Sequence, residues 1–157
     1  MIKQPKGTSF KAGTTLVGEF EWDPRFVQKL NGRLEEAQRY VDSEVLRLSE
    51  PYIPFQTGML RTSGITATEI GSGFVTYNTP YARNMYYGKV MVDPVTGAAG
   101  FLTKDGWRSR KGVRKVVSNR EYQYHGAPMR GAFWFERMKA DHKEDILRGL
   151  KKLLGVG

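Results

Sequence analysis

With 157 residues, of which 39% are hydrophobic and none is cysteine, the chain is expected to form one domain without disulfides, thiolate nucleophiles or cysteine-based metal sites. Its formal net charge of +9 favours polyanions or acidic protein surfaces as partners. No stretch approaches the ~20 apolar residues of a membrane span, and residues 1–7 lack the apolar region of a secretory signal, so we expect a soluble, unsecreted protein.

The first third of the chain is predicted to contain an arm, a strand and a long helix. Residues 1–13 are polar and show no periodicity, which predicts a flexible N-terminal arm. Residues 14–22 alternate apolar and polar side chains, which is typical of a strand. Asp23 and Pro24 then form a helix start, after which apolar residues recur every three or four positions as far as Leu48. A helix of about 25 residues, roughly 38 Å long, needs a broad sheet to cover its apolar stripe.

A proline-rich corner at residues 51–64 is predicted to end this helix. Proline fixes φ and lacks a backbone donor, so the helix is not expected to run past Glu50, and Pro54 favours a tight turn. Thr57 is then expected to cap one helical turn that crosses Gly58 and ends at Gly64. Each of these residues has a sufficient explanation in folding, so we interpret them as a structural motif.

Two strand-like runs follow the corner. Residues 65–70 and 74–79 flank the glycine-rich sequence at 71–73, which predicts a β-hairpin. A capping threonine before Pro80 then predicts a short helix that ends at Gly88.

Tyrosines crowd this short helix and its surroundings. They either pack across the end of the sheet or form a protein interface, in which tyrosine is enriched. The candidate interface residues are Tyr81, Tyr86 and Tyr87.

Residues 88–126 are predicted to form a long basic loop or arm, because glycines interrupt short apolar islands. The segment is either a solvated, flexible hairpin or a surface that meets a phosphate backbone or a neighbouring protein. The candidate intersubunit or DNA contacts are Lys104, Trp107, Arg108, Arg110, Lys111, Arg114 and Lys115.

A second amphipathic stripe, from Phe135 to Leu153, predicts a C-terminal helix. The expected fold is therefore a single α+β domain over 1–157: a small antiparallel sheet packed by a long N-terminal helix and a C-terminal helix, with long loop or arm insertions. His125 and His142 lack metal-ligand spacing, and the carboxylates of the last helix alternate with lysines. We predict no catalytic residue, metal site or cofactor and do not expect an enzyme.

Three blocks occur in order along the chain: residues 52–64 (YIPFQTGMLRTSG), 77–88 (YNTPYARNMYYG) and 133–138 (FWFERM). Together they resemble the minor capsid or tail-completion proteins of long-tailed bacteriophages, over about residues 14–154. Gln56 stands where an aspartate is frequent in that family, and residues 88–126 match it only in general character.

The resemblance implies a structural virion protein at the head-tail junction, assembled in the host cytoplasm. Such proteins form a ring, commonly of six subunits, between the head-closure ring and the major tail tube protein, with genomic DNA in the lumen and no membrane. The basic segment would face DNA or a neighbouring ring. A tail terminator or another neck ring is the alternative within the family. A free basic nucleic-acid-binding protein, suggested by the charge of +9, is the alternative from another class.

Overall fold

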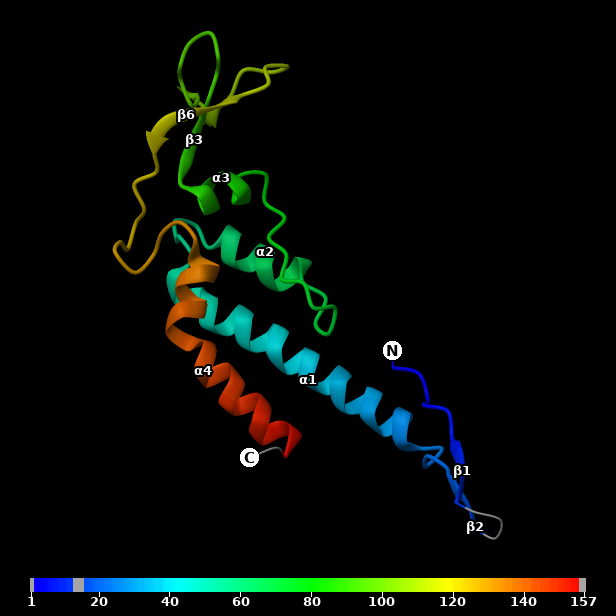
Figure 1. The fold of residues 1–157 in the computed structure, drawn as a ribbon. Helices are drawn as coiled ribbons and strands as arrows, with labels where there is room; N and C mark the ends of the chain where they lie inside the picture. Colours follow the sequence, from blue (N-terminus) through cyan, green and yellow to red (C-terminus); the bar gives the residue numbers. More distant parts are fainter. Residues whose placement is uncertain (1, 13–15, 156–157) are drawn as a thin grey trace.

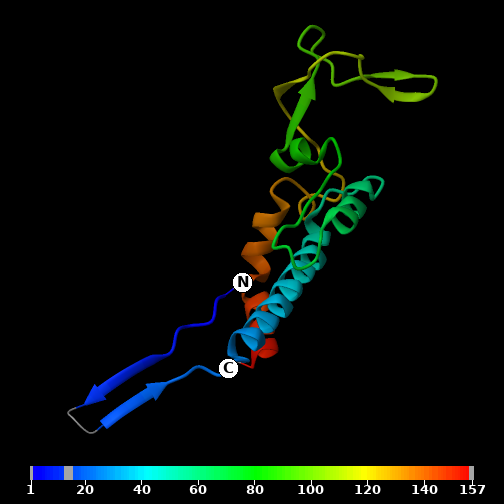
Figure 2. The same cartoon turned by 90° about the vertical axis from the view of Figure 1, so that its right-hand side faces the viewer.

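The computed structural model describes residues 2–12 and 16–155. These residues form an elongated molecule, in which a helical body carries a two-stranded ribbon at one end and a longer β arm at the other (Figure 1). A view turned by 90° shows that both projections stand clear of the body (Figure 2). The elements in chain order are β1 (Thr8–Ala12), β2 (Leu16–Phe20), α1 (Phe26–Ser49), the 3-10 helix η1 (Glu50–Tyr52), α2 (Met59–Ala67), α3 (Ala82–Tyr87), β3 (Lys89–Val92), β4 (Phe101–Thr103), β5 (Gly106–Arg108), β6 (Val116–Glu121) and α4 (Trp134–Leu154).

The fold class is α+β, as predicted, with long N- and C-terminal helices and small antiparallel sheets. The sheets are three separate two-stranded pairs, β1–β2, β3–β6 and β4–β5. The expectation that α1 covers a broad sheet is wrong, because within the described residues its apolar stripe packs mainly on α4. Two amphipathic helices can bury each other's stripes, whereas a two-stranded pair is too narrow to cover a long helix.

The core lies where the C-terminal half of α1 meets η1, α2, α3 and the start of α4. Met138 is 1% exposed, and Ile53 and Trp134 are each 2% exposed. The indole of Trp134 makes edge-to-face contacts with Tyr77 and Tyr86, with ring centroids 5.5 and 4.7 Å apart. Such geometry is the favoured one for aromatic pairs. The core is therefore concentrated at the end of the body from which the β arm projects (Figure 1).

The boundaries of α1 agree closely with the prediction. The carbonyl oxygen of Asp23 accepts a hydrogen bond from the Phe26 amide at 2.9 Å, and its Oδ1 accepts one from the Arg25 amide at 2.8 Å. Asp23 thus organises the turn that leads into α1, although the helix itself begins three residues later. At the other end α1 gives way to η1, which contains Pro51. The proline ends the α-helix because it cannot donate to the preceding turn.

The corner after η1 differs from the prediction in how its helix begins and ends. Gly58 is the N-cap of α2, with a left-handed φ of 77°, and no side chain caps that helix, so the cap expected from Thr57 is wrong. Gly64 does not end the helix but is buried within it. A Cβ at Gly64 would lie 2.5 Å from Cε1 of Tyr77. The close approach of this ring, rather than a turn, therefore explains the glycine.

The predicted hairpin at residues 65–79 is also wrong. Residues 65–67 belong to α2, and no strand is assigned between α2 and α3. A buried carboxylate holds the glycine-rich turn instead: Oδ2 of Asp42 in α1 accepts hydrogen bonds from the amides of Gly71 at 2.8 Å and Gly73 at 3.1 Å. These bonds satisfy backbone donors of the turn.

The short helix α3 and its end at Gly88 are confirmed, but its N-cap is Tyr81 and no side chain caps it, so the cap expected from the threonine before Pro80 is wrong. The next segment, 88–126, predicted as a long loop or arm, forms an arm that contains four strands. β3 and β6 pair antiparallel, with Lys89 opposite Glu121 and Val92 opposite Val116. The two valine-rich islands of the sequence contribute to these paired strands. β4 and β5 form a separate short hairpin nearer the tip of the arm (Figure 2).

The N-terminal segment contains regular structure that the sequence does not predict. Residues 8–12, expected to belong to a flexible arm, form β1 and pair with β2, so that Thr8 lies opposite Phe20 and Ala12 opposite Leu16. The strand predicted at 14–22 is confirmed for 16–20, and 13–15 lie outside the described residues. Backbone pairing with β2 gives β1 its structure without an alternating side-chain pattern.

The close contact between α1 and α4 gives a testable prediction. A Cβ at Gly149 would lie 1.7 Å from Oη of Tyr40, so the two helices approach too closely there for a side chain. Gly149→Ala is expected to lower the free energy of unfolding by about 1–3 kcal/mol, as overpacking does. Urea unfolding measures this change.

Gly32→Ala is the matched control, because Gly32 also lies in a long helix and no atom would approach an added Cβ within 4 Å. That substitution is expected to stabilise the protein by about 0.5–1 kcal/mol through helix propensity. Equal effects of both substitutions would contradict the close approach of α1 and α4.

Candidate functional site

The β arm formed by residues 88–126 contains most of the excess positive charge. It holds eight lysine or arginine residues against three acidic ones, which gives +5 of the chain's formal +9. We call this segment the basic arm. It projects from the end of the body beyond α3 and is built from β3–β6 at its base and β4–β5 farther out (Figure 1).

A single buried aspartate organises the middle of the basic arm. Asp93 is 5% exposed, and its Oδ1 accepts hydrogen bonds from the amides of Val95 at 2.8 Å and Thr96 at 3.2 Å. Its Oδ2 accepts a hydrogen bond from Nη1 of Arg110 at 3.1 Å. The bond from the Val95 amide and the pairing with Arg110 lower the pKa of Asp93. Sequence reasoning missed this residue, although Asp-Pro followed by Thr-Gly is a turn signature.

The candidate basic residues fall into two groups within this framework. Arg110 is bound to Asp93, the Nζ of Lys115 donates to the carbonyl oxygen of Ala99, and Arg108 lies 3.7 Å from Asp105. The second group is exposed and makes no ion pair within the described part of the chain; it consists of Lys104, Lys111 and Arg114. The backbone of Trp107 pairs with Leu102 across β4–β5, and its side chain lies outside the described part.

The Asp93 turn gives a pH prediction. Because the folded pKa is lowered, the stabilising contribution of this carboxylate is present above its unfolded pKa of about 3.9 and is lost as the pH falls through the folded value. We expect the amide resonances of Val95 and Thr96 to shift in NMR spectra on acidification below about pH 4. Asp93→Asn keeps an amide oxygen but no titrating group, so its spectra should lack this transition. Resonances that stay constant in the wild type down to about pH 2 would contradict the role of Asp93.

The candidate interface tyrosines occupy different environments. Tyr86 packs on Trp134 and its hydroxyl donates to Glu136, and its pKa is raised, chiefly by burial. Tyr81 is half-buried beside the core, whereas Tyr87 is 52% exposed. Tyr86 is therefore a packing residue, whereas Tyr87 is about half exposed although its ring contacts those of Tyr86 and Phe133.

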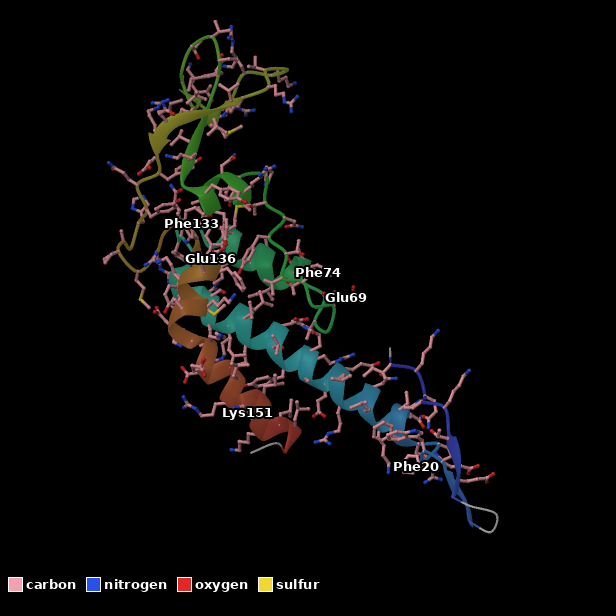
Figure 3. All side chains as sticks on the ribbon, in the orientation of Figure 1. Phe20, Glu69, Phe74, Phe133, Glu136 and Lys151 are labelled. Carbon is pink, nitrogen blue, oxygen red and sulfur yellow. The ribbon has the colours of Figure 1, made fainter. Side chains whose placement is uncertain are left out.

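An open groove runs along one side of the body next to these aromatic residues. It has a volume of about 710 Å³ and is lined by parts of α1, α3, the 73–77 segment and the start of α4. Phe74 borders it with 75% of its side chain exposed. Figure 3 shows Phe74 beside α2, with Phe133 and Glu136 where α4 begins. Phe133 has a left-handed backbone with φ of 50°, which is rare for a residue with a side chain.

The corner motif holds elements of the fold together. Pro54 is buried, while Thr57 and Pro80 are exposed. The guanidinium of Arg130 crosses from the segment before α4 and donates from Nη1 to the carbonyl oxygen of Ile53 at 2.6 Å. The corner is thus attached to the last third of the chain, which agrees with a folding role for Pro54 and Gly58.

A polar network lies between η1 and α4. The hydroxyl of Tyr52 donates to Oδ2 of Asp141 at 2.6 Å and lies 3.2 Å from Nε2 of His142. The bond to Asp141 is the main cause of the raised pKa of Tyr52. The other ring nitrogen of His142 faces Asp145 at 3.4 Å. This network links the corner to α4. His142, which lies on the apolar stripe of that helix, therefore has a structural role.

Within the described residues, no three His, Cys, Asp or Glu side chains are grouped so that they could hold a metal ion. None of the described helices combines the length and the apolar character that crossing a membrane requires. Comparison of the chain with protein-family models, with curated proteins and with solved structures found no match.

Proposed function

We propose that the protein is a structural component of the head-tail junction of a long-tailed bacteriophage. In this proposal, copies of the chain form a ring, commonly of six subunits, between the head-closure ring and the tail tube, with genomic DNA in the lumen. The three sequence blocks at residues 52–64, 77–88 and 133–138 support the family assignment. The surface of the isolated chain supports assembly into a larger structure.

The observation that carries this proposal is the large accessible surface of the single chain. It measures 12058 Å² for a mass of 17.8 kDa. A compact monomer of that mass exposes about 8000 Å² by the usual scaling of surface with mass. The difference of about 4000 Å² lies within the range of permanent protein interfaces. A chain with this much excess surface is expected to bury it against neighbours.

The exposed apolar side chains agree with this interpretation. Leu102 in the basic arm is 77% exposed, Phe74 beside the groove is 75% exposed, and Ile65 in α2 is 62% exposed. Isolated two-stranded pairs are marginally stable in water and leave backbone groups unpaired along their outer edges. Neighbouring subunits in a ring would cover both kinds of surface.

The decisive experiment is imaging of assembled virions from a phage that encodes this chain. Cryo-electron microscopy of the neck is expected to show the protein as a ring between the head-closure ring and the tail tube. Density at the end of the tail tube instead would identify a tail terminator or another neck ring. Virions that contain no copy of the chain would refute the proposal.

Neutralising part of the basic arm tests its contribution to the junction. The variant replaces Arg108, Arg110, Lys111 and Arg114 by glutamine, and it is expected to lower the yield of infectious particles at least tenfold, through failed joining or loss of DNA. The control removes the same number of charges from the outer face of α4, at Lys139, Lys143, Lys151 and Lys152. Normal particles from the first variant would show that the basic arm has no such role.

The concentration of charge in the basic arm favours one function of another class, free nucleic-acid binding. In that case the purified chain would bind duplex DNA with an affinity that falls steeply with salt, in proportion to the number of phosphates contacted. Ring formation with negligible DNA affinity would favour the junction protein. A fluorescence anisotropy titration at several salt concentrations separates the two.

A further inference from the structure

An acidic aromatic patch lies at the end of the molecule that carries β1–β2. Five consecutive exposed residues make up its centre: Glu19, Phe20, Glu21, Trp22 and Asp23. Phe20 and Trp22 are 55% and 37% exposed, and their rings contact each other edge-to-face at 5.4 Å. The cluster continues to Phe26, whose ring centroid lies 5.2 Å from that of Trp22. Exposed aromatic clusters of this kind are typical of interaction sites.

The carboxylates of this patch are available to a partner. Within the described residues neither Glu19 nor Glu21 makes an ion pair. Oδ1 of Asp23 accepts a hydrogen bond from the Arg25 amide, and its carbonyl oxygen accepts from the Phe26 amide and the Gln4 side chain. The five residues 19–23 carry a charge of −3. Lys3 and Lys6 belong to the segment that runs alongside, so the patch has a basic border. A complementary partner would present apolar side chains together with cations.

The outer part of the basic arm has this composition. Residues 101–115 contain six basic side chains and one acidic one. Phe101 and Leu102 at this tip are 50% and 77% exposed. Lys104 and Lys111 are exposed and make no ion pair within the described part of the chain. We call residues 101–115 the basic tip.

The patch and the tip lie at opposite ends of the elongated molecule (Figures 1 and 3). One copy therefore cannot bring its own patch and tip into contact unless its helical body unfolds. We propose that the basic tip of one copy docks on the acidic aromatic patch of a second copy, head to tail. Within the described residues, the outer edges of β1–β2 and β4–β5 have unpaired backbone groups. A strand of one ribbon can therefore pair with the edge of the other. This inference rests on the self-association that the proposed function requires.

A head-to-tail contact uses two different surfaces, so it repeats from copy to copy and closes into a ring or continues as a chain. A two-fold contact between identical patches would place the three carboxylates of one copy against those of another. Like charges that face each other across an interface cost several kcal/mol, whereas opposite charges steer association. The charge distribution therefore favours the head-to-tail arrangement.

Charge reversal at each surface tests the contact. The tip variant carries Lys104→Glu and Lys111→Glu, and the patch variant carries Glu19→Lys and Glu21→Lys. Each variant alone is expected to self-associate at least tenfold more weakly than the wild type in sedimentation velocity. An equimolar mixture should regain association, because the native patch of the tip variant meets the native tip of the patch variant, and the reversed tip meets the reversed patch.

Combining all four substitutions in one chain should restore association, since both surfaces then have reversed charge. Lys139→Glu with Lys143→Glu on α4 is the control for net charge and should leave association unchanged. Circular dichroism establishes that each variant is folded, and Leu102→Ala provides a second test that alters no charge and should also weaken association. The inference is wrong if the reversed variants associate like the wild type, or if the wild type stays monomeric at about millimolar concentration.

The outcomes also separate this inference from the proposed function. Virions that contain a ring of the chain while the tip and patch variants still assemble would leave the proposed function intact and refute the contact. Loss of DNA binding without loss of self-association in the tip variant would show that the tip serves nucleic acid instead. Absence of the chain from virions, together with head-to-tail association in solution, would refute the proposed function alone.

Discussion

Trp134→Ala is expected to lower the free energy of unfolding by about 3–5 kcal/mol, as other removals of buried aromatic residues do. The indole is 2% exposed and lies between the rings of Tyr77 and Tyr86. Its loss would leave a cavity where α1, α3 and α4 meet. Since the free energy of unfolding of whole domains is only about 5–15 kcal/mol, this single change would remove a large part of the total stability. The midpoint of urea unfolding and the near-ultraviolet circular dichroism measure the effect.

Phe135→Ala is the matched control for the tryptophan. Phe135 is the next residue of α4 and has a similar aromatic ring, but it is 40% exposed. Its replacement is expected to cost less than about 1 kcal/mol, as surface substitutions usually do. A Trp134→Ala variant as stable as the Phe135→Ala variant would show that the core does not lie where α3 and α4 meet.

Asp42→Ala is expected to cost about 2–4 kcal/mol, because hydrogen bonds to a charged acceptor contribute about 1.5–3 kcal/mol and the donors left behind are unsatisfied. The carboxylate is 3% exposed. It accepts hydrogen bonds from Gly71, Gly73 and the side chain of Gln38. Without it the 68–78 segment loses its attachment to α1. Urea unfolding measures the loss, and limited proteolysis is expected to cut within 68–78.

Asp42→Asn separates the hydrogen bonds from the charge. Its amide oxygen can still accept from the glycine amides, while its NH₂ group cannot. We expect this variant to lose about half as much stability as Asp42→Ala and to resist cleavage within 68–78. Ser43→Ala serves as the reference, because Ser43 is the next residue of α1 and its side chain is exposed. This substitution is expected to leave stability nearly unchanged. Cleavage of the wild type within 68–78 at the rate of Asp42→Ala would contradict the role of this carboxylate.

The helices were the most predictable part of the fold. Apolar residues at every third or fourth position between Phe26 and Leu48, and again between Phe135 and Leu153, suffice to specify α1 and α4. The C-terminal end of α1 was predictable too, because the proline that follows it is a local signal. That the two stripes pack on each other is not a local property. The periodicity of an apolar stripe is the same whether a sheet or a second helix covers it.

The errors fall at positions where a distant contact overrides a local signal. Ile65 and its β-branched neighbours favour a strand, and Gly64 before them favours a break. The structure places Gly64 and residues 65–67 in α2, because the glycine admits the ring of Tyr77 and the turn that follows is held by Asp42. Both partners are distant in sequence, so neither effect can be inferred from the residues at 65–79.

The candidate site was predictable in composition but not in arrangement. The excess of lysine and arginine at 104–115 and the grouping of tyrosines near Tyr86 are visible in the sequence. The division of the basic residues into those bound within the basic arm and those exposed depends on contacts made by the folded arm, such as that of Arg110 with Asp93, which forms only once β3 has placed the aspartate. In the sequence, the acidic aromatic patch resembles an ordinary strand. Its relation to the basic tip becomes apparent only when the structure places the two at opposite ends of the molecule.

The separation of the strands into three independent pairs has a consequence for local unfolding. No described helix or second sheet packs extensively on β1–β2, and an isolated two-stranded ribbon is only marginally stable in water. Its amides are expected to exchange with deuterium by local fluctuation, while those of α1 beside Met138 exchange only when the whole body unfolds. A partner that covers the ribbon would slow exchange there first. Amide protection at residues 16–20 therefore reports assembly residue by residue, without any substitution.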